Sequence, residues 1–325
     1  MIVLGIESTA HTFSVAILDN KTVLSNEKSV FTTEKGGMIP VKVAEHHNKI
    51  KDNVLKKALE KANIKLHDIE LVSFSQGPGL APALIVGRDF AEEIADDLNV
   101  PIIGVNHCIA HLEIGRMLFP SCKDPALLYV SGANTQVIAY DGGKYRIFGE
   151  TLDMGIGNFL DSFARFIGIG FPGGPEIEKL AKKGKEYIEL PYCVKGMDVN
   201  FGGILTNVKQ KYNSGKHKLT DLAYSIQETV FAMLIEVSER AMAHCEKNEL
   251  LLGGGVACNK RLQEMAKIMC KDRDAKCFIP ENQFLVDNAA MIGWLGLLMY
   301  KAGVRTKDID IRPYERTDDV DVKWR

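Results

Sequence analysis

The order of the predicted strands and helices repeats once along this chain, which restricts it to few architectures. Each half reads as three short β-rich runs, a helix, a strand, a glycine-rich turn, a helix, a strand and a closing helix. Strands that alternate with helices are typical of α/β domains. The repeat rests on this order of elements, since the halves share no residue-level identity. We therefore predict two duplicated α/β domains around a central cleft, over residues 1–120 and 121–302, with the C-terminal segment 303–325 joining the first.

Hydrophobic periodicity places the elements of each half. Apolar residues at helical spacing predict helices over residues 41–62, 82–98, 220–247, 259–271 and 288–302. Strands are predicted at IVLGIE, FSVAIL, TVLSNEK, ELVSFSQ and PIIGV in the first half, and at ALLYVSG, TQVIAYD, YRIFGET, ELLLGGG and KCFIP in the second. The tail DIDIRPYERTDDVDVKWR has no periodicity and predicts a peripheral strand, a surface segment or a linker.

Composition excludes several classes of protein. Of the 325 residues, 46% are hydrophobic and 25% are charged, which excludes a disordered chain. The formal net charge of −2 announces neither nucleic acid nor an anionic membrane as a partner. Seven cysteines without a C-x-x-C spacing argue against a zinc ribbon and a disulfide framework. No apolar run reaches the ~18 residues of a membrane span. We therefore expect a cytoplasmic protein with reduced thiols and no membrane partner.

Two histidines four positions apart, His107 and His111, form the clearest metal-ligand pattern. On a helix this spacing places both imidazoles on one face, one turn apart. Cys108 stands where a zinc protease of the H-E-x-x-H type has its glutamate, so that signature fails. Asp287, at the start of the last helix, is a candidate third ligand, although an aspartate there can equally cap the helix. The histidines can also be residues that cap or hydrogen-bond near a helix start.

Three turns rich in small residues are candidate ligand sites. Gly253-Gly254-Gly255 follows a buried strand and opens a helix, whose N-terminus favours an anion. Asn259 could cap that helix or bind a ligand through its amide. The turns at 131–135 and 5–10 each join two strands and can offer backbone N–H groups to a phosphate, but an ordinary hairpin turn is the simpler interpretation of the second.

Two carboxylates lie near a further glycine pair, Gly173-Gly174. Asp161 lies in an apolar helical stretch, so its side chain is either buried for a purpose or on the solvent face. Glu178 follows the glycines in GGPEIEKLA. The lysine runs at 56–57 and 182–185 are most simply solvated faces and only weakly suggest RNA.

Six motifs in a fixed order make the sequence similar to one known family. They are SQGPGL at 75–80, GVNHCIAH at 104–111, YVSGANTQV at 129–137, FPGGPEIE at 171–178, LLGGGVACNKRL at 251–262 and DNAAMIGWLG at 287–296. With them the chain resembles the TsaD family over essentially its whole length, specifically the archaeal and eukaryotic branch that forms the catalytic subunit of the KEOPS complex. The resemblance implies an actin-like (ASKHA) fold, in agreement with the duplicated α/β plan.

The resemblance also implies an activity, that of an N6-L-threonylcarbamoyladenine synthase, an acyltransferase. Members of the family move threonylcarbamoyl from threonylcarbamoyl-AMP to N6 of the adenosine 3′ of the anticodon in tRNAs that read ANN codons. The implied cofactors are one divalent metal per subunit, iron or zinc, and a nucleotide, which is threonylcarbamoyl-AMP and could include ATP. The implied partners are tRNA and the other KEOPS subunits: a small dimerising subunit, an atypical kinase/ATPase that is fused C-terminally in some archaea, and further small subunits.

The site residues of the family carry over to positions of this sequence. By resemblance the metal ligands are His107, His111, Tyr129 and Asp287. The positions that hold the adenylate are Tyr129, Val130, Ser131, Gly132, Ala133, Asp161, Gly174, Glu178 and Asn259. Ala133 replaces the second glycine of the family's Ser-Gly-Gly turn, and a positive φ there would strain an alanine by about 1 kcal/mol. The resemblance assigns no catalytic residue beyond the metal ligands.

Three other functions stay open from the sequence. A metalloprotease would use the histidine pair but lacks the glutamate after His107. An actin-like ATPase switch needs an acidic Mg²⁺-binding residue in the first strand, where Glu7 lies. A non-enzymatic scaffold for a partner kinase would have no need of His107, His111 and Asp287 together. We expect the transferase.

Overall fold

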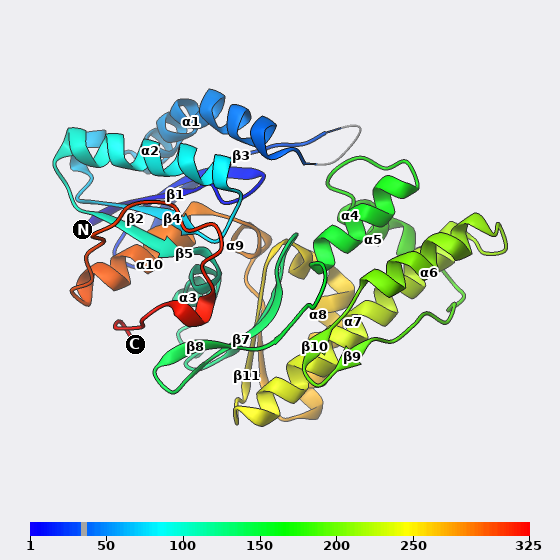
Figure 1. Cartoon of the computed structure of the whole chain (residues 1–325). Helices are drawn as coiled ribbons and strands as arrows, with labels where there is room; N and C mark the ends of the chain where they lie inside the picture. The colour runs from blue at the N-terminus through cyan, green and yellow to red at the C-terminus, as the bar shows by residue number, and fades with distance from the viewer. Residues whose placement is uncertain (34–37) are drawn as a thin grey trace.

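Two five-stranded mixed sheets and the helices around them build the fold (Figure 1). A computed structural model describes residues 1–33 and 38–325. The first half contains β1 (Ile2–Glu7), β2 (Thr12–Asp19), β3 (Thr22–Val30), α1 (Pro40–Ala62), η1 (Leu66–Asp68), β4 (Leu71–Gly77), α2 (Ala81–Leu98), β5 (Ile102–Asn106) and α3 (His107–Leu118). The second half contains β6 (Ala126–Val130), β7 (Thr135–Asp141), β8 (Lys144–Glu150), α4 (Ile156–Phe166), α5 (Gly174–Ala181), β9 (Val194–Lys195), β10 (Asp198–Val199), α6 (Gly202–Asn213), α7 (Leu219–His244), β11 (Glu249–Gly253), η2 (Gly255–Cys258), α8 (Lys260–Asp272), β12 (Lys276–Phe278), α9 (Asn282–Leu285) and α10 (Ala289–Lys301).

The two sheets have the same strand order, which confirms the duplicated plan. The first sheet runs β3-β2-β1-β4-β5 and the second runs β8-β7-β6-β11-β12. In each sheet the first three strands along the chain pair antiparallel, and the other two join parallel. The tail forms no strand: it contains the short helix η3 (Thr317–Asp319) in otherwise irregular backbone. No helix in the described part of the chain has a stretch both long and apolar enough to cross a membrane.

Helices cover both faces of the first sheet. Helices α1 and α2 lie on one face and α10 on the other (Figure 1). Strand β4 is consequently buried along its whole length, and its side chains do not alternate between buried and exposed. Helix α10 comes so close to β1 that a Cβ at Gly5 would lie 2.2 Å from the carbonyl oxygen of Ala289. Only glycine fits at that crossing.

Helices α3 and α10, which close the two halves, pack against each other between the sheets. Their apolar side chains form one cluster with Val3 and Leu71 of the first sheet and with Leu127 and Leu251 of the second. The predicted boundary at residue 302 would assign α10 to the second domain, yet α10 packs against β1, β2 and β4 of the first sheet. The division at residues 120 and 302 stays a prediction, and we would place the boundary before α10.

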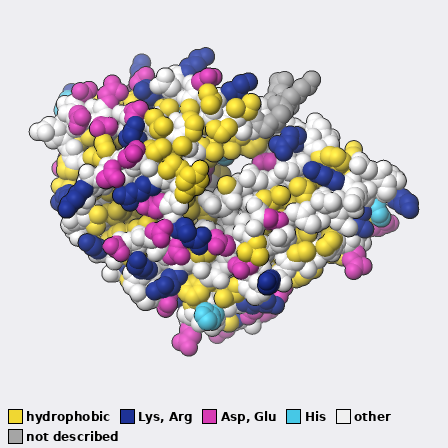
Figure 2. All heavy atoms as spheres, in the orientation of Figure 1, with side chains coloured by type: hydrophobic (Ala, Val, Ile, Leu, Met, Phe, Trp, Pro, Cys, Tyr) yellow, Lys and Arg dark blue, Asp and Glu magenta, His cyan; other side chains and the backbone are white. Residues whose placement is uncertain are grey.

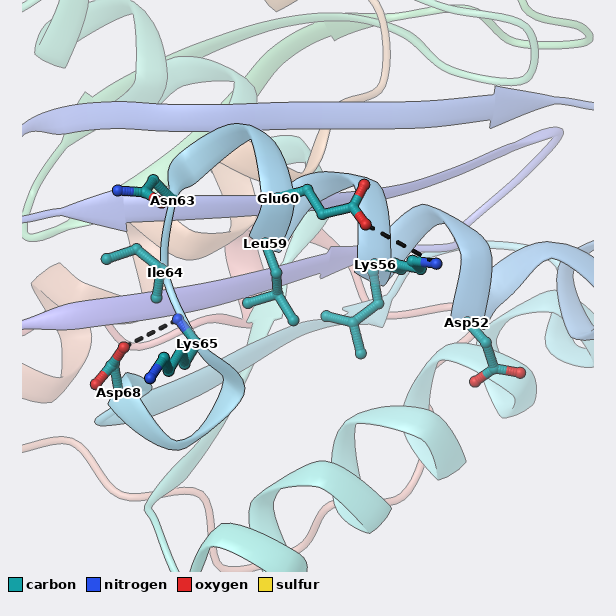
Figure 3. A pocket seen from close by; sticks show the side chains of 9 residues that line it. Asp52, Lys56, Leu59, Glu60, Asn63, Ile64, Lys65 and Asp68 are labelled. Atoms are coloured by element: carbon teal, nitrogen blue, oxygen red, sulfur yellow. Dashed lines mark hydrogen bonds and ion pairs between the residues drawn. The ribbon is translucent and has the colours of Figure 1, made fainter.

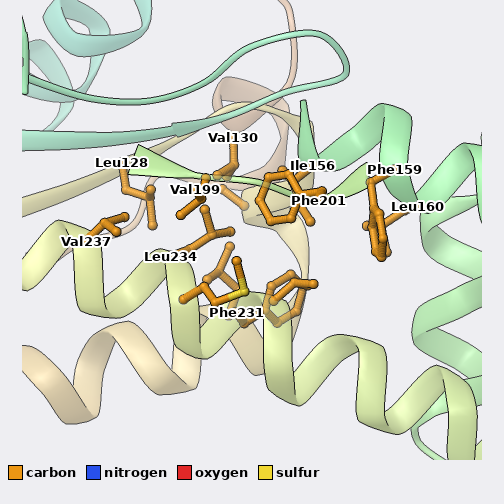
Figure 4. Packing of buried hydrophobic residues seen from close by; sticks show 14 of the residues in the cluster. Leu128, Val130, Ile156, Phe159, Leu160, Val199, Phe201, Phe231, Leu234 and Val237 are labelled. Carbon is orange, nitrogen blue, oxygen red and sulfur yellow. The ribbon is translucent and has the colours of Figure 1, made fainter. Parts of the chain in front are cut away.

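The outer face of the second sheet is covered by α7 and α8. Figure 4 shows Phe231, Leu234 and Val237 of α7 facing Leu128 and Val130 of β6. All five side chains are buried in one apolar cluster. Burial of a side chain of this size contributes roughly 1.5–3 kcal/mol, so the cluster holds this half together without a metal or a disulfide; all seven cysteines are free.

The C-terminal segment is tied to both halves by polar contacts. The amide of Gln76, at the end of β4, donates to the carbonyl oxygens of Asp308 and Asp310 at 2.8 and 2.7 Å. Arg316 pairs with Glu150 of β8 at 3.2 Å. The segment therefore bridges the halves and does not belong to the first alone.

Glu113 of α3 is a buried carboxylate on which several donors converge. Its side chain is 1% exposed. It accepts two hydrogen bonds from Arg116 at 2.8 and 3.1 Å, one from the indole N–H of Trp324 at 3.1 Å, and one from the hydroxyl of Tyr145 on β8. The carboxylate thus joins α3 to the second sheet and to the tail.

A wide hollow of about 560 Å³ lies over α1 and η1 (Figure 3). Its lining residues are Asp52, Leu55, Lys56, Leu59, Glu60, Asn63, Ile64, Lys65 and Asp68. They include no histidine, no cysteine and none of the predicted site residues. The hollow is therefore separate from the predicted site.

His47, on α1, is a buried histidine outside the predicted site. It is 0% exposed, its Nε2 lies 2.8 Å from the carbonyl oxygen of Ala10, and its ring lies beside Phe13 with centroids 5.4 Å apart. Burial lowers the pKa of His47 to about 4. The imidazole is therefore neutral at pH 7, with Nε2 donating to Ala10.

We predict that Glu113→Ala lowers the free energy of unfolding by about 3 kcal/mol, because it leaves the buried donors of Tyr145 and Trp324 and the charge of Arg116 without their acceptor. Chemical denaturation measures the difference. Glu93→Ala is the matched control, since Glu93 is exposed on α2 and makes no ion pair with any described residue. Equal losses in the two variants would contradict the anchoring role of Glu113.

We also predict that acid weakens the fold through His47. The unfolded chain protonates this imidazole near its ordinary pKa of 6.5, whereas the folded state holds it neutral to about pH 4. Below pH 6.5 the unfolded state binds more protons, so stability falls as the pH drops from 6.5 to 4, by roughly 3 kcal/mol in total. The free energy of unfolding, measured by denaturation at several pH values in this window, should change less with pH in His47→Gln than in the wild type. His67→Gln, at an exposed position, is the control. A pH dependence unchanged by His47→Gln would refute this assignment.

Candidate metal centre

The two predicted histidine ligands lie in the first turns of α3. The helix is capped by Asn106, whose side-chain oxygen accepts from the N–H groups of Cys108 and Ile109 at 3.0 and 3.2 Å. Neither histidine is therefore needed as a cap. The spacing of four residues places both rings on one helix face, with centroids 4.9 Å apart. The side chains of His107 and His111 are 4% and 0% exposed.

Asp287 completes a cluster of three candidate ligands. Its Oδ1 lies 3.4 Å from Nε2 of His107 and 3.5 Å from Nε2 of His111. The three ligand atoms all lie within 4.8 Å of one another. Asn288, rather than Asp287, caps α10, because its side-chain oxygen accepts from the N–H of Met291 at 3.1 Å. The carboxylate of Asp287 is therefore free to face the histidines.

The donor set fits a transition-metal ion. The hydroxyl of Tyr129, on β6, lies 3.0 Å from Nε2 of His107 and adds a fourth oxygen or nitrogen donor. Both ring nitrogens of His111 are buried and have no hydrogen-bond partner among the described residues. Buried polar atoms are normally satisfied, and a bound cation would satisfy Nε2. Two imidazoles, a carboxylate and a phenol suit zinc or ferrous iron rather than magnesium.

Glu7, at the end of β1, holds His107 from the opposite side. Its Oε2 lies 2.9 Å from Nδ1 of His107, and its Oε1 accepts from the N–H of Thr9 at 2.7 Å and from the Thr9 hydroxyl. Glu7 is 0% exposed. A carboxylate on Nδ1 fixes the tautomer and leaves Nε2 as the ligand atom. The sequence suggested Glu7 only as a magnesium ligand; its bond to His107 joins residues 100 positions apart, and the one available signal was an acidic residue ending a buried strand.

The charges in the cluster depend on one another. Burial by itself would lower the pKa of His107, but Tyr129 and Glu7 outweigh it and raise that pKa well above 6.5. Burial lowers the pKa of His111. Burial would raise the pKa of Asp287, but the two histidines, whose Nε2 atoms lie 3.4 and 3.5 Å from its Oδ1, hold that pKa well below 3.8. Without a metal, the proton on His107 therefore supplies the positive charge that faces Asp287.

The turn predicted to hold the adenylate starts next to this cluster. Ser131 follows Tyr129 by two residues, and its N–H donates to the carbonyl oxygen of Asn134 at 2.8 Å. The turn lies against the N-terminus of α4, where the N–H of Gly157 donates to the carbonyl oxygen of Ser131 at 3.0 Å. Ala133 is not among the described residues with a positive φ, so the alanine causes no strain there.

Val130 and the glycine-rich turn are placed by backbone packing. The side chain of Val130 lies in the apolar core (Figure 4), so only its backbone faces the turn. Gly254 has a φ of +91°, and a Cβ there would lie 2.3 Å from the carbonyl oxygen of Val130. Gly254 is therefore required by the close approach of the two chain segments, while no atom within 4 Å would obstruct a Cβ at Gly255.

Asp161 and Gly174 lie together where α4 and α5 meet. Oδ1 of Asp161 accepts from the N–H of Gly173 at 2.7 Å. Burial raises the pKa of Asp161, although hydrogen bonds from the N–H groups of Gly173 and Gly174 partly offset it. The half-buried carboxylate thus fixes the N-terminus of α5.

Glu178 and Asn259 form a separate group, where α5 meets α8. Glu178 pairs with Lys182 at 2.9 Å and lies 3.4 Å from the backbone nitrogen of Lys260. Asn259 caps α8 through its side-chain oxygen, and its amide donates to Gln227 at 2.9 Å. The cap explains Asn259 structurally and leaves one amide hydrogen for a ligand.

Comparison with known proteins gives a consistent result. A family profile described as "TsaD: tRNA N6-adenosine threonylcarbamoyltransferase" matches residues 21–294. A protein of that name from Thermococcus kodakarensis is 56% identical over 326 residues, covering all of both chains. A "Probable bifunctional tRNA threonylcarbamoyladenosine biosynthesis protein" from Thermoplasma acidophilum is 50% identical, and the match covers all of this chain and 61% of that one.

Two solved structures share the architecture at low identity. Thermococcus kodakarensis HypF aligns with a TM-score of 0.64 and 15% identity, over 96% of this chain and 49% of that one. An activator of 2-hydroxyisocaproyl-CoA dehydratase from Clostridium difficile aligns with a TM-score of 0.56 and 13% identity, over 95% of this chain and all of that one. At such identities the likeness concerns the fold alone, and it confirms the expected actin-like (ASKHA) architecture.

The family profile and the relatives that are 56% identical over the full chain point to the same family, and the duplicated sheets are consistent with it. The relatives that match over their entire length are named for a transferase, so the chain is an enzyme of that class. The protein belongs to the TsaD family of tRNA N6-adenosine threonylcarbamoyltransferases.

Proposed function

We propose that this protein transfers a threonylcarbamoyl group from threonylcarbamoyl-AMP to N6 of the adenosine 3′ of the anticodon in tRNAs that read ANN codons. Family membership supports the general role, which is in tRNA threonylcarbamoyladenosine biosynthesis. The finer proposal rests on the buried cluster of His107, His111, Tyr129 and Asp287 beside the turn that begins at Ser131. A metal site next to an open turn of small residues suits an activated acyl donor.

The residues of this chain would divide the work as follows. His107, His111, Tyr129 and Asp287 would hold iron or zinc, which when bound supplies a Lewis acid for an oxygen of the donor. Glu7 keeps Nε2 of His107 directed at the metal position. Hydrogen bonds join Glu7, His107 and Tyr129 before substrate arrives, so these side chains need little reorganisation during the reaction.

The donor would lie along the second half. The small turn at 131–133 permits close approach of the adenylate to the backbone. Asp161 and Glu178 would accept hydrogen bonds from ribose hydroxyls or amine groups, and Gly174 would leave room for the nucleoside. The N6 amine attacks the carbamoyl carbon, the bond from that carbon to the phosphate oxygen breaks, AMP leaves, and the amine loses a proton to solvent. The adenosine must be unstacked to reach this position.

The proposal extends to partners and location. We place the protein in the cytoplasm, in a KEOPS complex with a small dimerising subunit, an atypical kinase/ATPase and further small subunits. Support for a coupled second activity comes from the bifunctional names of relatives that continue beyond the matched region. ATP is a further candidate ligand of the nucleotide position.

The competing functions have less support. An ATPase switch would need Glu7 free for magnesium, but hydrogen bonds to Thr9 and His107 engage both of its oxygens. A metalloprotease would need a general base beside the histidines, and the residue after His107 is a cysteine whose pKa burial raises to about 11. A scaffold would not need an unsatisfied buried imidazole such as His111.

We predict that His107→Ala, His111→Ala and Asp287→Ala each reduce bound iron or zinc from about one ion per chain to near zero and abolish transfer, because a transition metal loses affinity steeply when a ligand is removed. Elemental analysis after dialysis measures the metal. His67→Ala, which removes an exposed histidine at η1, is the control. Metal retained by all three ligand variants, or their failure to fold, would contradict the assignment.

We predict that Glu7→Gln weakens metal binding by roughly 10–100-fold, because an outer carboxylate orients its histidine and raises the basicity of that ligand. A competition titration against a coloured chelator measures the affinity. Glu60→Gln, at an exposed position of α1, should bind metal as the wild type does. An affinity unchanged by Glu7→Gln would show that the Glu7–His107 bond does not support the site.

A further inference from the structure

Several cations lie at the ends of α4 and α6, where Tyr212 packs on Phe166, and the carboxylates of Asp161 and Asp221 lie near two of these cations, Arg165 and Lys218. Residues 199–220 contain four lysines, a histidine and no aspartate or glutamate, in a chain with a formal net charge of −2. Residues 162–175 also lack carboxylates and contribute Arg165. Figure 2 shows Lys and Arg side chains together with hydrophobic ones and some Asp and Glu side chains over the second half. We call it the α4–α6 patch, defined by Arg165, Phe166, Lys209, Lys211, Lys216 and Lys218.

The cations of the patch are not used by the fold. Within the described residues, none of the five pairs with a carboxylate, whereas the neighbouring Lys179 and Lys182 of α5 pair with Glu176 and Glu178. A group of unpaired like charges destabilises a surface slightly through repulsion. Their presence on one face of a near-neutral protein therefore indicates a polyanionic ligand.

An exposed aromatic ring lies among these charges. Phe166 is 38% exposed. Nζ of Lys209 lies 5.2 Å from the centre of its ring, and Tyr212 meets the ring edge-on with centroids 5.8 Å apart. A single exposed phenylalanine needs no explanation. A ring with a lysine beside it offers both a stacking face for an unpaired base and a charge for a phosphate.

Helix α4 links the patch to the donor turn. Its first turn bonds to Ser131 through Gly157, and Phe166 is its last residue. At a rise of 1.5 Å per residue, its 11 residues span about 15 Å. After α4 the chain meets the first half, where the ring of Phe171 lies 5.3 Å from that of His11. The patch itself lies at the other end of α4, one helix length from the donor turn, and extends along α6 away from the first half (Figure 1).

We infer that the α4–α6 patch holds the phosphates of the tRNA anticodon arm while its adenosine reaches the donor turn. This inference rests on the proposed function, because it takes tRNA as the acceptor. With 3.4 Å of rise per nucleotide in a strand, about 15 Å corresponds to roughly four nucleotides. Phosphates about that far along the strand from the modified adenosine would lie over the patch. Phe166 would stack on a loop base, and the lysines would contact phosphates.

The test measures binding of an unmodified transcript of an ANN-decoding tRNA to the full chain, without donor, by fluorescence anisotropy between 50 and 200 mM NaCl. The variants are Lys209→Ala/Lys211→Ala on α6 and Lys216→Ala/Lys218→Ala on the loop after it. The matched control is Lys267→Ala/Lys271→Ala, two exposed lysines on α8 that pair with no described carboxylate. Phe166→Ala tests whether the ring contributes to tRNA binding.

Each patch pair should reduce the slope of log affinity against log salt by about 1–2 and weaken binding at least tenfold, while the control pair stays near wild type. Phe166→Ala should weaken binding roughly tenfold with little change in slope. In transfer assays, the patch variants should raise KM for tRNA and leave kcat unchanged, because they do not contact the reacting atoms.

The outcomes separate this inference from the proposed function. If tRNA binding depends on the patch but no transfer occurs, the proposed transferase function is contradicted and the tRNA-binding surface is supported. If transfer occurs and the patch variants match the control pair in tRNA affinity, salt slope and KM, the assignment of the patch as a tRNA-binding surface is wrong. A wild-type chain with no measurable tRNA affinity at 50 mM salt would also contradict it. Patch variants that lose binding to polyglutamate but keep binding to tRNA would assign the surface to an acidic protein instead.

Discussion

The burial of α3 on every side is the constraint on which the site depends. Nine consecutive residues of this helix, from His107 to Gly115, are buried between the two sheets. A polar group on such a helix needs a partner from another element, because an unsatisfied group there costs about 1–3 kcal/mol, and His111 is the group whose ring nitrogens have none among the described residues. His107 is held by Glu7 and Tyr129, and Glu113 by Tyr145 and Trp324. The ligand positions are thus fixed by the packing of the whole molecule.

Duplication explains why the cluster forms where it does. Helix α3 follows β5, and α10 follows β12, so the two helices hold equivalent places in the two halves. The histidines come from the start of one helix and Asp287 from just before the other. Because α3 and α10 pack against each other between the sheets, their N-terminal ends bring these ligands together. A fold of one half alone would supply only part of the set.

Local patterns were enough to predict most of the strands, the main helices and the duplicated α/β plan, because period and turn chemistry are properties of neighbouring residues, while the actin-like fold was implied by the family resemblance. The H-x-x-x-H spacing likewise indicated a shared helix face. What the sequence could not show were partners far along the chain: the bond from Glu7 to His107, and the contact of Trp324 with Glu113. Asn259 proved to be a helix cap, and Asn288 rather than Asp287 caps α10, a distinction that spacing alone does not make. The packing of α10 against the first sheet is also a tertiary contact that local patterns do not show.

The decisive measurement is threonylcarbamoyladenosine formation in a reconstituted reaction. The chain and its partner subunits would be incubated with unmodified tRNA and threonylcarbamoyl-AMP, with and without a chelator, and the tRNA nucleosides analysed by mass. We predict that the modified nucleoside forms, disappears with the chelator and returns when iron or zinc is restored. A metal-loaded complex that makes none, or a fully metal-free complex that makes as much, would contradict a metal-assisted transfer at His107, His111 and Asp287.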